Sequence, residues 1–168
     1  TGPTTPDAAS LIEPVVCEIE ESLGDLIFGS ENEELHDVLL RDFAQRGKTL
    51  TTVEGPSDGL LAHWLTKADS AHTVFLGGLV DSSLTTQTNG DASESLEKRL
   101  IAQQAATGAT SAVGLATLDG SPDQAILIAI DEGQVFQKQM LLKFHPDITA
   151  VIAAKRALNL LRLNSSRS

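Results

Sequence analysis

The stretch "TTVEGPSDGLLAHWL", residues 51–65, decides the fold because it passes through three kinds of local structure. Its β-branched start predicts a strand that ends at Glu54, and "GPSDG", with Pro56 and two glycines, predicts a turn. A helix should follow, beginning near Ser57 or Asp58. Its apolar positions are Leu60, Leu61, Trp64 and Leu65. Such a corner presents backbone N–H groups to a ligand, so it is the first place to look for chemistry.

On the N-terminal side of this corner, the pattern predicts two helices and a short extended piece. Residues 11–23 have near-helical apolar spacing, and residues 26–28 read as extended. "SENEELHDVLLRDFAQRG" predicts a helix over 30–46, with Ser30 as its N-cap and Gly47 at its end.

On the C-terminal side, "HTVFLGGLV" at 72–80 is almost continuously apolar, which favours a strand covered on both faces. Its Gly77 and Gly78 indicate a bend or a close approach of backbone. Residues 81–92 read as a loop. The remaining predicted elements are a helix at 93–107 capped by Ser93, strands at 110–117 and 124–132, a hairpin into 135–144, and a helix at 146–163. This alternation predicts a layered α/β/α domain with helices on both faces of one mixed sheet.

Composition excludes several classes of function. The 168 residues carry a formal net charge of -11, which opposes binding to nucleic acid or to anionic lipid. No apolar run is long enough to span a membrane. Cys17 is the only cysteine, so we expect no intrachain disulfide and a cytoplasmic protein. We expect no cofactor. The four histidines lie too far apart in sequence to indicate a metal site: His36, His63, His72 and His145.

The segment "LGDLIFGSENEELHDVLLRDFAQRGKTLTTVEGPSDGLLAHWLTKADSAHTVFLGG", residues 23–78, resembles the CinA family. The resemblance is to its C-terminal nicotinamide-mononucleotide amidohydrolase domain and to the segment before it, and it covers about residues 15–163. Matching positions are Gly24, Asp25, Gly29, Leu35, Glu54, Gly59, Leu65, Phe75, Gly77, Gly78 and Val80.

The resemblance implies a CinA C-terminal-like α/β domain at 30–163, preceded at 11–29 by a segment like the end of the preceding CinA region. Residues 1–10 then form a linker or tail, and residues 164–168 form a second tail. The linker-like start also admits that the chain is a fragment of a longer CinA-like protein.

The chemistry that the resemblance implies is hydrolysis of the amide of nicotinamide mononucleotide. In the family a serine is the nucleophile, a lysine is its base and a tyrosine assists. Here the serine position is Gly55, the tyrosine position is Ser82 and the lysine position is Gln87. Glycine has no side chain that can attack, and a neutral amide is no base. The family's glycine-rich stretch is reduced to "LATLDGSPDQA" at 115–125, and its late arginine falls on Ile148. These departures predict a degenerate active site.

Two polar residues remain weak catalytic candidates. Ser57 is either a cap or turn residue or a displaced nucleophile, and the capping interpretation is favoured. Glu54 either holds the turn through backbone hydrogen bonds or assists catalysis, as His63 could. A ligand at the turn would meet the backbone of the residues that close it: Gly55, Ser57, Gly59, Gly77 and Gly78.

The sequence therefore leaves two functional hypotheses. The first is a catalytically inactive CinA C-terminal-like module that serves as a structural, oligomerisation or ligand-sensing domain and forms a homo-oligomer. The second is a nicotinamide-mononucleotide amidohydrolase that uses Ser57. Under either hypothesis, the small-molecule partner is nicotinamide mononucleotide or a related compound.

Overall fold

The computed structural model describes residues 33–85, 92–118, 121–142 and 146–165. The chain divides into two compact units, residues 1–32 and residues 33–168, and the elements of the second unit make up the fold. The predicted helix at 11–23, the extended piece at 26–28 and the sites at Cys17, Ser30, Gln87 and His145 lie outside the described residues.

Five strands form one mixed sheet in the order β2-β1-β3-β4-β5. The strands are β1 (Leu50–Glu54), β2 (Phe75–Val80), β3 (Ser111–Leu118), β4 (Ser121–Asp131) and β5 (Gln134–Leu141). β1 is parallel to both β2 and β3, whereas β3, β4 and β5 are joined by antiparallel pairings. The predicted α/β class with one mixed sheet is confirmed.

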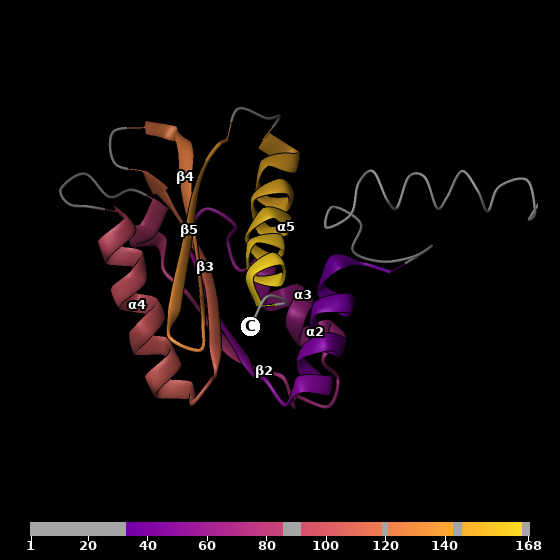
Figure 1. Ribbon diagram of the computed structural model, residues 1–168. Helices are drawn as coiled ribbons and strands as arrows, with labels where there is room; N and C mark the ends of the chain where they lie inside the picture. Colours follow the sequence, from indigo (N-terminus) through magenta and orange to yellow (C-terminus); the bar gives the residue numbers. More distant parts are fainter. Residues whose placement is uncertain (1–32, 86–91, 119–120, 143–145, 166–168) are drawn as a thin grey trace, which may run out of the picture. The chain divides into compact units, whose positions relative to one another are not determined.

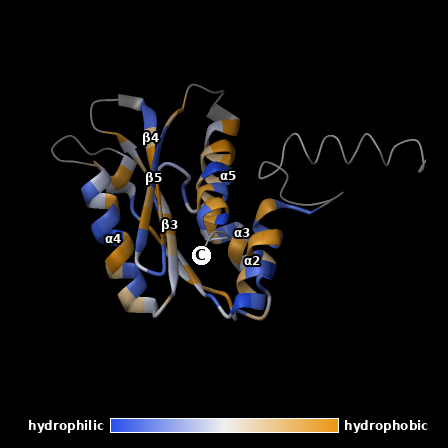
Figure 2. Cartoon of the chain, viewed as in Figure 1, coloured by the Kyte–Doolittle hydropathy of each residue, from blue (hydrophilic) through white to orange (hydrophobic). Residues whose placement is uncertain are grey.

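Helices cover both faces of this sheet (Figure 1). Among the described elements, one face is packed by α2 (Leu35–Arg46), α3 (Leu60–Ala68) and α5 (Pro146–Ser165), and the other by α4 (Ala92–Thr107). Hydrophobic and hydrophilic residues alternate along the helices (Figure 2), and buried apolar side chains such as Leu39 and Phe43 of α2 belong to the core. A short 3-10 turn, η2 (Ser82–Thr85), follows β2 and inserts Leu84 into the α4 layer.

The starts of three helices differ from the sequence prediction. α2 begins at Leu35, where Glu34 and Asp37 form a reciprocal capping box, and it ends at Gly47 in the left-handed conformation as predicted. α4 begins at Ala92, so Ser93 lies inside the helix, where its hydroxyl donates to Gln137. α3 begins at Leu60 behind Gly59 (φ 88°), so neither Ser57 nor Asp58 is the residue before the helix.

The prediction that residues 72–80 are covered on both faces is wrong. β2 is an edge strand, and Leu76, Leu79 and Val80 are 37%, 38% and 52% exposed. The predicted close approach at Gly78 is confirmed, because a Cβ there would collide with the hydroxyl of Thr52 on β1. The hairpin between β4 and β5 is also confirmed. Glu132 (φ 48°) and Gly133 (φ 81°) make its tight turn.

Candidate functional site

The corner after β1 is organised by the buried carboxylate of Glu54. One oxygen accepts the backbone N–H of Leu61 at 2.9 Å, and the other accepts that of Ala62 at 2.8 Å. These N–H groups belong to the first turn of α3, which has no partner for them within the helix. Glu54 therefore caps the first turn of α3 from the preceding strand. The N-cap residue itself, Gly59, needs no side chain for this purpose.

Ser57 lies beneath the same turn and is only 2% exposed. Its hydroxyl donates to Glu54 at 2.6 Å, and its carbonyl accepts the N–H of Leu60 at 3.0 Å. The structure thus brings together the two weak catalytic candidates, Ser57 and Glu54, in a buried hydrogen bond. His63 is exposed on the second turn of α3 and lines a separate pocket with residues of α2 and α5.

Gly55 occupies the position that the CinA resemblance assigns to a serine nucleophile. A Cβ on Gly55 would lie 2.7 Å from Cβ of Leu84 and 3.0 Å from its backbone carbon. Real Cβ atoms do not approach other atoms so closely, and Leu84 is fully buried. The volume in which a nucleophilic side chain would stand at this corner is therefore filled by η2.

A polar network holds η2 in this place. The carboxylate of Asp81 accepts the N–H of Ser83 at 2.9 Å and its hydroxyl at 2.7 Å, and it is paired with Arg99 of α4. Arg99 also donates to the hydroxyl of Ser83 at 3.1 Å. The hydroxyl of Ser83, and then its N–H and Arg99, lower the pKa of Asp81 against the opposing effect of burial. Contacts to Asp81, which follows β2, and to Arg99 of α4 thus fix the turn that carries Leu84.

The other positions expected to meet a ligand are only partly gathered at the corner. A Cβ on Gly59 would lie 3.2 Å from a methyl of Val80, so the turn packs directly on β2. Gly78 packs against Thr52 and Ala62, and Gly77 (φ 121°) bends the strand. Ser82 is exposed on η2. Within the described part of the chain, none of these positions lines a second pocket, at the junction of three helices.

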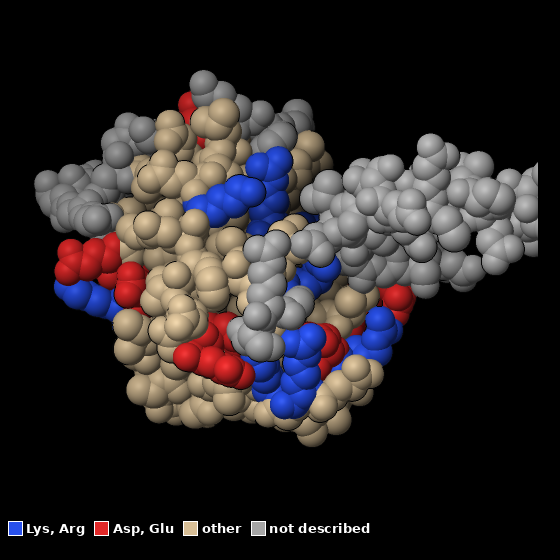
Figure 3. Space-filling view, viewed as in Figure 1, with Lys and Arg blue, Asp and Glu red and all other residues tan. Residues whose placement is uncertain are grey.

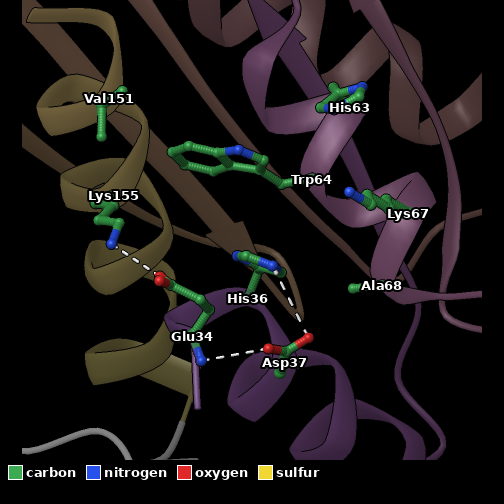
Figure 4. Close-up of a pocket in the computed structure, with 9 residues that line it drawn as sticks. All are labelled: Glu34, His36, Asp37, His63, Trp64, Lys67, Ala68, Val151 and Lys155. Atoms are coloured by element: carbon green, nitrogen blue, oxygen red, sulfur yellow. Dashed lines mark hydrogen bonds and ion pairs between the residues drawn. The ribbon is translucent and has the colours of Figure 1, made fainter. Parts of the chain in front are cut away.

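That pocket, which the sequence did not reveal, lies where α2, α3 and α5 meet. It has a volume of about 610 Å³ and is lined by Glu34, His36, Asp37, His63, Trp64, Lys67, Ala68, Val151 and Lys155. The rings of His36 and Trp64 stack inside it, with centroids 5.7 Å apart and planes inclined by 17° (Figure 4). No sequence periodicity links these residues, because three separate helices contribute them.

The charges on the described surface are mixed. On the face shown in Figure 3, lysine and arginine side chains lie beside aspartate and glutamate, and no broad basic patch forms. In the part of the chain that the structure describes, no three His, Cys, Asp or Glu side chains are grouped to hold a metal ion. No described helix is both long enough and apolar enough to cross a membrane.

Part of the sequence is similar to known proteins. No protein-family model matches the chain. A CinA-like protein of Prochlorococcus marinus is 34% identical over 76 residues, which are 45% of this chain and 18% of that protein. A protein of Moorella thermoacetica named as competence-damage inducible is 40% identical over 76 residues, with the same two shares. The matched segment thus spans less than a fifth of the length of these relatives.

Solved structures extend the likeness over most of the chain. A CinA superfamily protein of Klebsiella pneumoniae superposes with a TM-score of 0.67 at 17% identity, covering 81% of this chain and 100% of the other. One from Escherichia coli gives a TM-score of 0.64 at 18% identity, covering 84% and 98%. At these identities the superpositions establish the fold alone. The chain is thus related in sequence to CinA-like proteins over nearly half of its length and has the fold of CinA superfamily structures.

Proposed function

We propose that this chain is a CinA C-terminal-like module that lacks the family's amide hydrolysis and serves in structure, oligomerisation or ligand sensing. The observation that carries the proposal is the position of Leu84, which fills the space beside Gly55. A nucleophile needs both a side chain and room for substrate beside it, and the corner offers neither at this position.

The remaining polar groups of the corner support the same conclusion. Both carboxylate oxygens of Glu54 accept hydrogen bonds from α3, and one of them also accepts the hydroxyl of Ser57. Glu54 therefore holds the turn, and removing it from this role would leave buried N–H groups unpaired. As parts of the proposal, the module is cytoplasmic and takes nicotinamide mononucleotide or a related small molecule as a ligand and not as a substrate.

The decisive experiment is incubation of the full chain with nicotinamide mononucleotide and measurement of released ammonia. We expect release at the rate of the protein-free control. A rate well above that control, lost on substitution of one side chain of the corner, would refute the proposal. Ser70→Ala serves as the matched control because Ser70 is an exposed serine outside the corner.

The alternative is an amidohydrolase that uses Ser57 as a displaced nucleophile. One observation favours it: the hydroxyl of Ser57 lies 2.6 Å from the carboxylate of Glu54, within reach of a general base. Its burial opposes the alternative, because substrate must reach the oxygen. Ammonia release that disappears in Ser57→Ala and persists in Ser70→Ala would establish it.

We further propose that the module associates with a second copy of itself through β2. This strand has the sequence "FLGGLV", without a charged or hydrogen-bonding side chain, and it exposes Leu76, Leu79 and Val80 at the sheet edge. The opposite edge, β5, carries Lys138 and three glutamines. Charged and polar edge strands resist pairing, whereas an apolar edge invites it. Two copies of a strongly acidic chain can meet at β2 without bringing like charges together.

A further inference from the structure

The pocket between α2, α3 and α5, defined above by its nine lining residues, is separate from the corner after β1. Of the family-site positions that the structure describes, neither Gly55 nor Ser82 lines it. Its volume of about 610 Å³ falls within the range of roughly 300–1,000 Å³ that is usual for small-molecule sites. Figure 4 shows Trp64 projecting from α3 into the middle of this space, with His36 beneath it and Lys67 and His63 on the side of α3.

The two acidic side chains of the pocket, Glu34 and Asp37, each have a partner within the protein. Glu34 accepts a hydrogen bond from Lys155 at 2.8 Å, and this bond, followed by the charge of Lys155, lowers the pKa of Glu34. Asp37 accepts the backbone N–H of Glu34 as part of the capping box and lies 3.8 Å from His36. Glu34 thus ties the start of α2 to α5, and Asp37 takes part in the cap at the start of α2.

The basic side chains on α3 are not engaged in this way. Within the described residues, neither Lys67 nor His63 forms a side-chain hydrogen bond or an ion pair, whereas Lys155 is paired with Glu34. They are four residues apart on one helix, so they flank the same stretch of the pocket. The side chains of the pocket that remain available to an anionic group are therefore Lys67 and His63, although the chain as a whole carries a formal net charge of -11.

Trp64 supplies the apolar and aromatic surface beside these cations. His36 stacks on the indole and fixes its orientation, and Ala68 and Val151 complete an apolar wall. Aromatic faces favour offset stacking with other planar rings. A ligand that suits both features needs a flat ring and an anionic group within a few bonds of each other.

We propose that this pocket binds a planar aromatic ring bearing an anionic group, with nucleoside monophosphates as the chemical class. The ring packs on Trp64, and the phosphate meets Lys67 and His63. This deepens the ligand-sensing part of the proposed function, yet it concerns a different surface, so ammonia release and binding at this pocket are measured independently.

The sequence provides its own reporter, because Trp64 is the only tryptophan and the chain contains no tyrosine. Intrinsic fluorescence of the full chain is followed during titration with adenosine 5′-monophosphate, with adenosine and with inorganic phosphate. We expect a saturable change with the monophosphate, and binding at least about tenfold weaker with either part alone. Adenosine lacks the charge-assisted contacts to Lys67 and His63, and inorganic phosphate lacks the ring that packs on Trp64.

Variants assign the binding to this pocket. Lys67→Ala should weaken monophosphate binding about tenfold, while the matched control Lys138→Ala, an exposed lysine on β5, should leave it unchanged. Calorimetric titration of Trp64→Leu should show a similar loss, and thermal unfolding checks that each variant is folded. Absence of a saturable change at millimolar ligand, or equal affinity of wild type and Lys67→Ala, would overturn the proposal. Equal affinity for adenosine and its monophosphate would also overturn it.

Discussion

Gly55 is the residue on which the proposed absence of amide hydrolysis depends most directly. Restoring the family's side chain by Gly55→Ser should not restore activity, because the new Cβ would collide with Leu84. We expect a loss of about 1–3 kcal/mol in the free energy of unfolding, as is typical of overpacking. Urea denaturation measures the loss, and the ammonia assay with nicotinamide mononucleotide should stay at background.

Leu84→Gly in the Gly55→Ser background tests the cause of that loss, because the atom of residue 84 nearest to a Cβ at residue 55 is the Cβ of Leu84. Removing that Cβ should make the serine substitution less costly than it is in the parent chain, which gives a non-additive double-mutant cycle. If the two substitutions instead add independently, Leu84 does not limit the space beside residue 55.

Lys48 is the residue on which the opposite end of the sheet depends. Its ammonium lies 2.8 Å from Asp131 and 3.0 Å from Glu132, and Asp131 also accepts the hydroxyl of Ser111 at 2.6 Å. Burial acts to lower the pKa of Lys48, but the hydrogen bonds to Asp131 and Glu132 outweigh it and raise that pKa. The pair joins the start of β1 to the start of β3 and the end of β4.

Lys48→Met should destabilise the fold by about 3–5 kcal/mol, because it leaves Asp131 buried without its counter-charge. The matched control is Lys98→Met, whose pair with Glu94 is exposed to solvent, so its loss should change stability far less. Urea midpoints compare the two. Equal effects would mean that the buried pair contributes no more than a surface pair.

At the scale of the element, two carboxylates that flank α3 in the sequence fix how the helix connects to the chain before and after it. Glu54 serves its first turn by accepting the N–H groups of Leu61 and Ala62. Asp69 follows its last turn and accepts the N–H groups of Val74 and Phe75 at 2.8 and 2.7 Å, which fixes the path into β2. Burial of Asp69 acts to raise its pKa, but these hydrogen bonds outweigh it and set the pKa below the ordinary value of 3.8.

The direction of this shift gives a pH prediction. A carboxylate with a lowered pKa in the folded state contributes stability above its unfolded pKa, and that contribution is lost as pH falls through the folded value. Asp69→Asn should therefore be less stable than wild type at neutral pH, and the difference should shrink below about pH 4. Urea midpoints over this range measure it, and a difference independent of pH would contradict the assignment.

The elements also show how far sequence reasoning reaches. Strand and helix types follow from local apolar periodicity, so the α/β layers were predictable from stretches such as residues 51–65. Helix starts were not, because Glu34 and Glu54 cap from positions that propensity alone does not select. The exposure of β2 depends on its place at the sheet edge, which local pattern does not encode.

For the candidate site, the sequence could predict only which residue types stand at the positions of the CinA resemblance. Gly55 could be read directly, but the filling of its space by Leu84 depends on η2, which folds back from a segment beyond β2. The Asp-Ser-Ser run at 81–83 is a turn signal that could have drawn attention to it. The pocket at Trp64 had no local signal, because its lining comes from three helices.

At the scale of the whole molecule, the two edge strands of the sheet differ in the polarity of their side chains. Both edges expose apolar side chains, with Leu79 at 38% on β2 and Leu141 at 54% on β5. Only β5 sets these among a lysine and glutamines. If β2 is the surface that joins two copies, a charge placed there should prevent association, and the same charge on β5 should not.

Leu79→Lys and Leu141→Lys make that comparison with one kind of substitution. We expect the wild type and Leu141→Lys to elute as the same oligomer in light-scattering chromatography, and Leu79→Lys to elute as a monomer. Because both leucines are partly exposed, each variant should retain the cooperative thermal unfolding of the wild type, which separates lost association from lost folding. A monomeric wild type at high protein concentration would refute association through β2. So would dissociation by both substitutions alike, since the effect would then come from added charge anywhere on the sheet edges.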